Sequence, residues 1–286
     1  MTETVLNCLD QAARFLESAG VPEATTSAEA LLSHVLGRSP LALHLESGLQ
    51  VEEETKRQFQ TLLAKRASRY PLQYLIRTVA FRGVVLQVGP GCLIPRPETE
   101  FLVERLLGAA AQASEPIKVL DIGTGSGNIA ISLAEERPSW RVTGTDLSEE
   151  ALEFARRNAV QNGVQERINF VQADLWGEIE EKSFDILVSN PPYLTRSDFR
   201  ALQPEIAFEP RLALDGGEDG LSFYRRMIRD AHRVLKPEGL ICFEVGIHQA
   251  SSVAQMLNEA GAQAIQIFKD DTGIDRVLLA RWMSHG

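Results

Sequence analysis

The segment Asn190-Pro191-Pro192-Tyr193 combines residue types that can hold a planar amine group. The side-chain oxygen of Asn190 and the backbone carbonyl of Pro191 are acceptors, and the prolines stiffen the turn because each fixes φ at about −65°. An amide nitrogen is a poor nucleophile, so two acceptors for its N–H groups would orient it and stabilise the positive charge that develops on it. Tyr193 adds an aromatic face. These residues predict chemistry at an amine or amide nitrogen, with an ordinary proline turn as the alternative.

A second candidate site is the glycine-rich segment at residues 123–127. It follows an apolar run at 118–122 and precedes a helical pattern at 128–136, an order in which backbone N–H groups approach a ligand closely. Asn128 stands where the dinucleotide fingerprint G-x-G-x-x-G requires its last glycine, which weakens a nicotinamide interpretation. The candidate ligand-binding residues of this segment are Gly123, Thr124, Gly125, Ser126 and Gly127.

Two acidic residues follow the next two predicted strands. Asp146 ends the strand at 141–145, where its carboxylate can accept hydrogen bonds from both hydroxyls of a ribose. A capping role before a helix that begins near Ser148 is the alternative, and the two roles are compatible. Asp174 and Leu175 follow the strand at 168–172 and combine a polar acceptor with an apolar side chain, which suits the edge and face of an adenine.

The elements that position these residues alternate between strands and helices from residue 117 onward, which predicts a parallel α/β sheet. Four strands, at 118–122, 141–145, 168–172 and 184–189, each end at a candidate residue. In an open parallel sheet, ligands bind beyond the carboxyl ends of the strands. Four candidate segments at the ends of four strands therefore indicate a ligand site more specifically than any one of them alone. The remaining expected elements are a helix at 222–235, a turn at 236–239, and strands at 240–245, 265–268 and 277–282.

The first 70 residues have a different pattern. Apolar residues recur at helical spacing in four segments, at about 5–16, 26–37, 40–45 and 51–68, and predict a small helical bundle without a catalytic constellation. Residues 71–97 contain short β segments and glycine turns, which indicates a hairpin-like connector.

Composition restricts the class of protein. The chain has 286 residues, 44% hydrophobic and 24% charged, as in soluble globular proteins with room for two domains. No apolar stretch has the length of a membrane span, and the N-terminus lacks a secretory pattern. Cys8, Cys92 and Cys242 are far apart and have no metal-ligand spacing. We therefore expect a cytoplasmic protein without a metal site.

The charge is unevenly distributed. Residues 1–90 carry 9 basic and 9 acidic residues, whereas the rest carries 20 basic and 30 acidic residues. This balance argues against a large phosphate-binding face, so we expect no direct binding of nucleic acid. The alternative is that the acidic excess only supports solubility.

Residues 121–127, Asp146 and residues 190–193 resemble the class I S-adenosylmethionine-dependent methyltransferases that have an (Asn/Asp)-Pro-Pro-aromatic motif. More narrowly, the chain resembles the protein-(glutamine-N5) methyltransferase family that acts on bacterial release factors. The similarity extends over almost the whole length and includes residues 71–74, 94–100, 209–214, 219–221, 243–246, 269–270 and 275–277. The family usually has a glycine where this chain has Arg77, so the connector turn is expected to differ.

The resemblance implies an α/β class I methyltransferase fold, a Rossmann-like seven-stranded sheet whose last strand is antiparallel. It implies a helical substrate-recognition domain at 1–75, a β-hairpin-like connector at 76–97 and a methyltransferase domain at 98–286. The activity implied is methylation of the N5 nitrogen of the glutamine in the Gly-Gly-Gln loop of class 1 peptide-chain release factors. Because the methyl group of S-adenosylmethionine is already activated, positioning would supply most of the catalysis, without metal, covalent nucleophile or strong base.

The resemblance also implies residue roles. The glycine segment would surround the methionine part of the cofactor, Asp146 would hold the ribose, and Asp174 and Leu175 the adenine. Asn190 would border both cofactor and substrate. The implied catalytic residues are Asn190, Pro191 and Tyr193, and the implied substrate-binding residues are Asn190, Pro191, Pro192 and Tyr193.

Three other functions remain open on the sequence. One is methylation of a nucleic acid at adenine N6 or cytosine N4, because the Asn190 turn can hold those amines equally well. Another is methylation of a glutamine in a ribosomal protein. The third is a non-catalytic module that binds the cofactor and docks on a partner. Such a module would have no need of the Asn190 turn.

Overall fold

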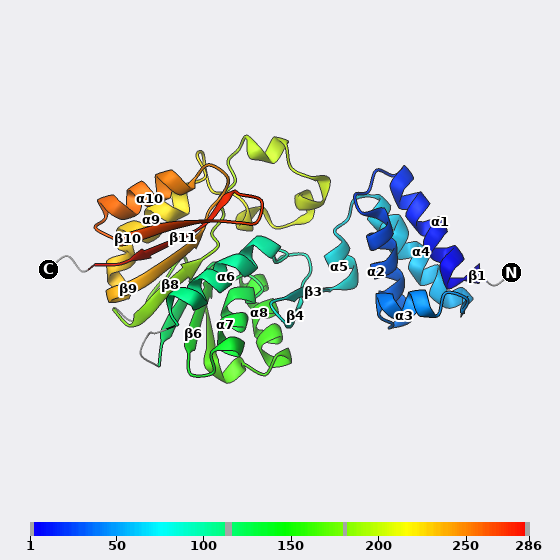
Figure 1. Ribbon diagram of the computed structural model, residues 1–286, viewed down its shortest axis with the longest axis horizontal. Coiled ribbons are helices and arrows are strands. Elements are labelled where there is room, and N and C mark those ends of the chain that lie inside the picture. Colours follow the sequence, from blue (N-terminus) through cyan, green and yellow to red (C-terminus); the bar gives the residue numbers. More distant parts are fainter. Residues whose placement is uncertain (1–2, 112–115, 180–181, 284–286) are drawn as a thin grey trace. The chain divides into compact units, whose positions relative to one another are not determined.

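The computed structural model describes residues 3–111, 116–179 and 182–283 (Figure 1). The chain divides into two compact units. One consists of Met1–Thr78 together with Gln203–Phe208, and the other of Val79–Leu202 together with Glu209–Gly286. We call them the helical unit and the sheet unit. No helix in the described ranges is long and apolar enough to cross a membrane.

The helical unit contains the four predicted helices and a fifth that was not predicted. They are α1 (Val5–Ser18), α2 (Ala24–Leu36), α3 (Pro40–Leu45), α4 (Glu53–Ala67) and α5 (Leu72–Ile76). Two short strands, β1 (Glu3–Thr4) and β2 (Gln50–Val51), pair antiparallel. The apolar stripes of α1, α2 and α4 meet in one core, as their helical spacing predicted.

The segment Gln203–Phe208 is held in the helical unit by ionic contacts. Glu205 accepts hydrogen bonds from Arg69 Nη2 at 2.7 Å and from Arg66 Nη1 at 2.9 Å. Nearby, the rings of Tyr70 and Phe208 pack edge to face with their centroids 5.0 Å apart. This segment was not predicted to have a role, because its partners lie more than 130 residues earlier in the chain.

Residues 78–87, within the range predicted as a connector, form a two-stranded sheet of β3 (Thr78–Phe81) and β4 (Val84–Gln87). Arg82 and Gly83 join the strands with φ values of 43° and 81°, as in the tight turns that match strand twist. Arg77 ends α5 with a φ of 63°, in the left-handed region. That conformation explains why a glycine suits the position.

The sheet unit is built on seven strands in the order β10-β11-β9-β8-β5-β6-β7. They are β5 (Lys118–Ile122), β6 (Arg141–Asp146), β7 (Ile168–Gln172), β8 (Phe184–Ser189), β9 (Leu235–Glu244), β10 (Gln263–Lys269) and β11 (Asp275–Arg281). Strand β11 is antiparallel to both of its neighbours, and strands β7, β6, β5, β8 and β9 are parallel. The predicted α/β sheet with an antiparallel final strand is confirmed.

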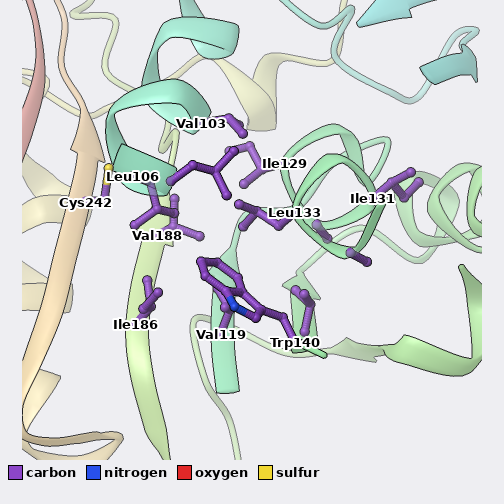
Figure 2. Close-up of a cluster of buried hydrophobic side chains, with 14 of the residues drawn as sticks. Val103, Leu106, Val119, Ile129, Ile131, Leu133, Trp140, Ile186, Val188 and Cys242 are labelled. Atoms are coloured by element: carbon purple, nitrogen blue, oxygen red, sulfur yellow. The ribbon is translucent and has the colours of Figure 1, made fainter. Parts of the chain in front are cut away.

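Helices cover both faces of this sheet. The side chains of α6 (Pro97–Ala109), α7 (Asn128–Glu136) and α8 (Glu149–Gln161) contribute to one core, and those of α9 (Ser222–Asp230) and α10 (Ala250–Glu259) to the other. Neighbouring residues of β5 alternate, since Val119 belongs to the first core and Leu120 to the second. Figure 2 shows the first core, where Leu106 and Leu133 meet the side chains of the sheet.

Two predictions about the last third of the chain were wrong. Helix α9 ends at Asp230, a 3-10 turn follows at Ala231–Arg233, and β9 begins at Leu235, so the predicted helix at 222–235 is too long. The predicted turn at 236–239 lies inside β9, where the pairing with β8 is irregular. A register irregularity of this kind tolerates a proline and a glycine within a strand. Helix α10 was not predicted.

Short 3-10 turns occupy the connections. They are η1 (Gln165–Arg167), η2 (Asp198–Arg200), η3 (Pro204–Phe208) and η4 (Arg211–Ala213). The last three lie between β8 and α9, in the long segment that follows the Asn190 turn.

Candidate active site

A cavity of about 1130 Å³, including space open to solvent, lies in the sheet unit. Its walls come from the residues that follow β5, β6, β7 and β8, from the beginning of α6 and from residues 210–213. The parallel order of these strands brings their carboxyl ends to one edge of the sheet. The sequence placed its candidate residues at these ends, and most of them line the cavity.

The glycine loop is shaped by hydrogen bonds to β6. The backbone N–H groups of Gly123 and Thr124 donate to the carbonyl of Thr145 at 2.8 and 2.9 Å. Gly123 and Gly125 have φ values of 70° and 55°, and an added Cβ at Gly123 would meet no atom within 4 Å. The backbone at this point therefore borders open space, as a ligand cradle requires.

Gly127 has a different surrounding. It precedes α7 with a φ of 82°, and an added Cβ would lie 3.0 Å from the side chain of Ile131. Gly127 is not among the described residues that line the cavity. Its geometry supports close packing of the helix more directly than ligand contact. Thr124 and Ser126, in contrast, line the cavity with Gly123 and Gly125.

Asp121 supports the loop from inside the core. Thr124 Oγ1 donates to Asp121 Oδ2 at 2.6 Å, and both side chains are buried. Burial raises the pKa of Asp121 to about 7, because the charged form of the carboxyl is disfavoured there. Asp121 was not predicted to have a separate role. Its place within an apolar run, three residues before a loop threonine, is the signal that could have indicated this contact.

Asp146 lies at the end of β6 and lines the cavity. Its Oδ2 atom accepts from the backbone N–H of Gly125 and its Oδ1 atom from that of Ser148, each at 2.9 Å. The N-cap of α8 is Ser148, whose Oγ accepts from Ala151 N at 3.2 Å, so the side-chain cap that was the alternative role for Asp146 belongs to Ser148. Burial raises the pKa of Asp146 and these backbone hydrogen bonds oppose the rise. A carboxylate oxygen with one partner still has a lone pair for another donor.

Asp174 and Leu175 also line the cavity. Asp174 Oδ2 forms an ion pair of 2.7 Å with Arg226 Nη2, and Leu175 is buried with a left-handed φ of 61°. Phe223, from the beginning of α9, is a further wall residue that sequence reasoning missed. No local pattern connects Phe223 with Asp174, because only the fold brings α9 to this edge of the sheet.

The Asn190 turn follows β8 directly. Ser189 Oγ donates to the carbonyl of Ile122 at 2.7 Å and fixes the end of β8 against β5. Asn190, Pro191 and Pro192 line the cavity, and Asn190 Nδ2 donates to Thr99 Oγ1 at 3.0 Å. The amide of Asn190 therefore has a defined orientation.

Tyr193 lies differently from the other three residues of the turn. Among the described residues, the cavity wall does not include it. Its ring packs against the apolar core of α9 and α10, and its carbonyl accepts from Gln249 Nε2 at 2.9 Å. Burial raises the pKa of its phenol to about 12. The contact of Tyr193 with a substrate stays a prediction.

A buried carboxylate joins two further segments of the cavity wall. Glu209 accepts from the backbone N–H of Ile94 at 3.0 Å and from Arg96 Nη2 at 2.5 Å. Arg96 and Pro210 both line the cavity. The ion pair therefore ties the chain before α6 to the segment that follows residue 208. No separate role was predicted for Glu209.

Comparisons with known proteins agree with this geometry. The sequence matches the family models "Methyltransferase small domain" over residues 97–208 and "PrmC N-terminal domain" over residues 7–76. A release factor glutamine methyltransferase of Geobacter sulfurreducens is 40% identical over 279 residues, covering 97% of this chain and 96% of the relative. The chain belongs to the release factor glutamine methyltransferase family. The family predicted from the sequence is confirmed.

A second member of the release factor glutamine methyltransferase family, from Fusobacterium nucleatum, is 36% identical over 98% of this chain and 79% of its own length. The crystal structure of a methyltransferase from Pyrococcus furiosus shares the fold, with a TM-score of 0.54 and 20% identity over 80% of this chain and all of that one. The predicted class I methyltransferase fold is thus confirmed. Like the other members of its family, the chain is a methyltransferase that uses S-adenosylmethionine.

Proposed function

We propose that this chain transfers a methyl group from S-adenosylmethionine to the side-chain amide nitrogen of the glutamine in the Gly-Gly-Gln motif of class 1 peptide-chain release factors. The observation that carries the proposal is that Asn190 and Pro191 line the same cavity as the glycine loop. One cavity therefore offers acceptors for an amide beside a cradle for a cofactor. Membership of the family supports the choice of substrate.

The cavity residues fit the cofactor. The open backbone at Gly123 and Gly125 can lie against its methionine part, and the Asp146 carboxylate can accept from ribose hydroxyls. Leu175 and Phe223 supply apolar surface for an adenine, with Asp174 beside them. When bound, S-adenosylmethionine supplies a methyl group that its sulfonium already activates.

The role of the Asn190 turn is to present the substrate amide. Asn190 Oδ1 and the carbonyl of Pro191 accept the two N–H hydrogens of the glutamine side chain, so its nitrogen is oriented toward the methyl group. The same acceptors stabilise positive charge as it develops on that nitrogen. Since the nitrogen becomes acidic once it is methylated, its proton can leave late and no strong base is needed.

The helical unit is proposed to recognise the release factor. It contains the match to the N-terminal family model, and it also contains Gln203–Phe208. That segment is covalently continuous with the cavity-wall residues at 210–213. Within the helical unit, Glu205 pairs with Arg66 and Arg69. A release factor substrate also implies a cytoplasmic location.

The experiment that tests the proposal offers alternative substrates to the full-length enzyme. Release factor, ribosomal proteins and double-stranded DNA are each incubated with enzyme and radiolabelled S-adenosylmethionine, and incorporated label is counted. We expect label in the release factor alone. Label in ribosomal protein or DNA alone would transfer the proposal to that substrate. Binding of the cofactor without label in any of them would indicate a non-catalytic module.

A further inference from the structure

A chain of two hydrogen bonds connects the Asn190 amide to a buried carboxylate. Asn190 Nδ2 donates to Thr99 Oγ1 at 3.0 Å, and Thr99 Oγ1 donates to Glu244 Oε2 at 2.7 Å. The three residues come from the end of β8, the first turn of α6 and the end of β9. Thr99 and Glu244 are each only 1% exposed.

The number of hydrogens available in these two hydrogen bonds decides which end of the Asn190 amide faces Thr99. A threonine hydroxyl has one hydrogen, and an ionised carboxylate can only accept. The hydrogen of Thr99 is therefore used by Glu244, and only the NH2 end of Asn190 can face the remaining lone pairs of Thr99. The carbonyl oxygen of Asn190 is then the end left for a ligand, as an acceptor for a substrate amide.

The opposite arrangement would remove the acceptor. If Glu244 carried a proton, it could donate to Thr99, and the Thr99 hydroxyl could then donate to Asn190 Oδ1. The Asn190 amide would turn and present its NH2 group to the NH2 group of the substrate. Two donors facing each other leave both unpaired and hold no substrate in place.

We propose that Thr99 and Glu244 are positioning residues that fix the Asn190 amide with its carbonyl oxygen toward the substrate. The inference rests on the proposed function, because it assigns the Asn190 carbonyl to a substrate amide. It deepens that function by adding two buried residues that act through Asn190, of which Thr99 also borders the cavity and Glu244 lies behind it.

The surroundings of Glu244 allow its charge to change near neutral pH. Burial raises its pKa to about 7, and the hydrogen bond from Thr99 opposes the rise. The charged and titratable groups that interact electrostatically with Glu244 are Arg276 from β11, Arg96 and Glu98 at the beginning of α6, Tyr224 from α9, Cys242 on its own strand, and Tyr193. Arg276 is itself paired with Asp270, Nε to Oδ2 at 3.1 Å, so its charge is shared.

The first test compares two substitutions of Thr99. Thr99→Val keeps the shape and removes the hydroxyl, whereas Thr99→Ser keeps the hydroxyl. We expect Thr99→Val to lower kcat on release factor by about 10–100-fold, by analogy with the loss of a hydrogen-bond partner that orients a metal ligand. Thr99→Ser should keep kcat near the wild-type value, because it retains the hydroxyl that donates to Glu244. Affinity for S-adenosylmethionine, measured by calorimetry, should be unchanged in both.

The second test reverses the direction of the two hydrogen bonds that join residues 190, 99 and 244. In Glu244→Gln the new amide can donate to Thr99, whose hydroxyl then donates to residue 190, so this variant should also lose kcat. In Asn190→Asp two carboxylates compete for the single Thr99 hydrogen. Combining the two substitutions restores one donor for each acceptor, with a carboxylate oxygen left for the substrate. The double variant should therefore have a higher kcat than Asn190→Asp alone. If the two substitutions only damaged the structure independently, their losses in kcat would add and the double variant would be the least active.

The dependence of kcat on pH distinguishes an effect on the orientation of the Asn190 amide from an effect on packing around Glu244. Protonation of Glu244 permits the turned amide, so wild-type kcat should fall as the pH decreases through about 7, where its pKa lies. In Glu244→Gln this acidic limb should be absent. If kcat of Glu244→Gln fell with decreasing pH in the same way as that of the wild type, this result would contradict the role of Glu244.

The inference is overturned if Thr99→Val has wild-type kcat, or if Thr99→Ser is impaired as strongly as Thr99→Val. Inactivity of the wild-type enzyme on release factor would instead overturn the proposed function. In that case the NMR signal of the Asn190 side-chain NH2 group decides the inference without any substrate. It should shift in Thr99→Val and Glu244→Gln and hold its position in Thr99→Ser. An unmoved signal in Thr99→Val would refute the proposed orientation.

Discussion

The carboxylate of Asp146 accepts a hydrogen bond from the backbone N–H of Gly125 at 2.9 Å. This contact ties the end of β6 to the loop that follows β5. The same carboxylate also accepts from Ser148 N, so it stabilises both the loop and the beginning of α8. A residue placed in this way shapes the cofactor cradle before any ligand arrives and still borders the cavity.

Replacement of Asp146 by alanine should weaken cofactor binding. The substitution removes the proposed acceptor for the ribose and releases the Gly125 backbone. With about 1.5–3 kcal/mol for each hydrogen bond to a charged group, the dissociation constant for S-adenosylmethionine should rise at least 10-fold. Calorimetry measures it, and Asp174→Ala is the matched control with a smaller expected effect, because Asp174 is mostly exposed and already paired. Unchanged affinity in Asp146→Ala would remove the residue from the site.

Replacement of Asn190 by alanine should affect turnover more than cofactor binding. It removes one of the two amide acceptors and leaves the glycine loop and Asp146 intact. We expect kcat on release factor to fall by about 10²-fold or more, the loss typical of one preorganised polar contact. Steady-state kinetics and calorimetry measure the two effects. Near-wild-type turnover would contradict the assigned role of Asn190.

Replacement of Glu205 by glutamine should destabilise the helical unit in a pH-dependent way. Burial disfavours its charge, but the hydrogen bonds from Arg69 and Arg66 outweigh burial and lower its pKa to about 2. A lowered carboxyl pKa stabilises the folded state above the ordinary value of 4.5, and this contribution is lost as the pH falls toward 2. At neutral pH the variant should lose about 1–3 kcal/mol of unfolding free energy.

Thermal unfolding at neutral and acidic pH measures this difference. The gap between wild type and Glu205→Gln should narrow as the pH falls below about 4.5. Glu54→Gln is the matched control, because Glu54 forms an ion pair with Arg57 that is exposed to solvent and should contribute little. A gap of equal size at both pH values would show that the charge of Glu205 is not what matters.

Replacement of Arg77 by glycine should stabilise the protein slightly. Arg77 holds a left-handed φ of 63° at the end of α5, where a side chain costs about 1–2 kcal/mol. Glycine removes that strain but gives the unfolded chain more conformational freedom, so the expected gain is about 0.5–1 kcal/mol. Urea unfolding measures it, and a loss of stability would indicate a favourable contact of the arginine that outweighs the backbone strain.

The ends of the strands could be predicted because each carries two local signals. At Asp146 and Asn190 an apolar run stops at a polar residue, and the parallel topology then places both residues at one edge of the sheet. The boundaries of β5 and α7 were predicted correctly for the same reason. Here hydrophobic pattern and turn chemistry point to the same structure.

Glu244 and Glu205 could not be assigned in this way. Glu244 interrupts an apolar strand, and its partner Thr99 lies 145 residues earlier in the chain, where it reads as an ordinary helix start. Glu205 pairs with arginines of the helical unit, which no local pattern connects to a segment after β8. The extent of β9 was missed because Pro237 and Gly239 are typical of turns, and only the irregular pairing with β8 accommodates them.

The central claim is that the enzyme methylates one glutamine amide, and locating the modification tests it most directly. Release factor is incubated with the full-length enzyme and S-adenosylmethionine, digested, and sequenced by tandem mass spectrometry. A factor whose Gly-Gly-Gln motif carries alanine in place of the glutamine serves as the control. The account predicts one added methyl group on the side chain of that glutamine, absent from the control factor and strongly reduced with the Asn190→Ala enzyme. A methyl group on any other residue, or undiminished methylation of the control factor, would contradict it.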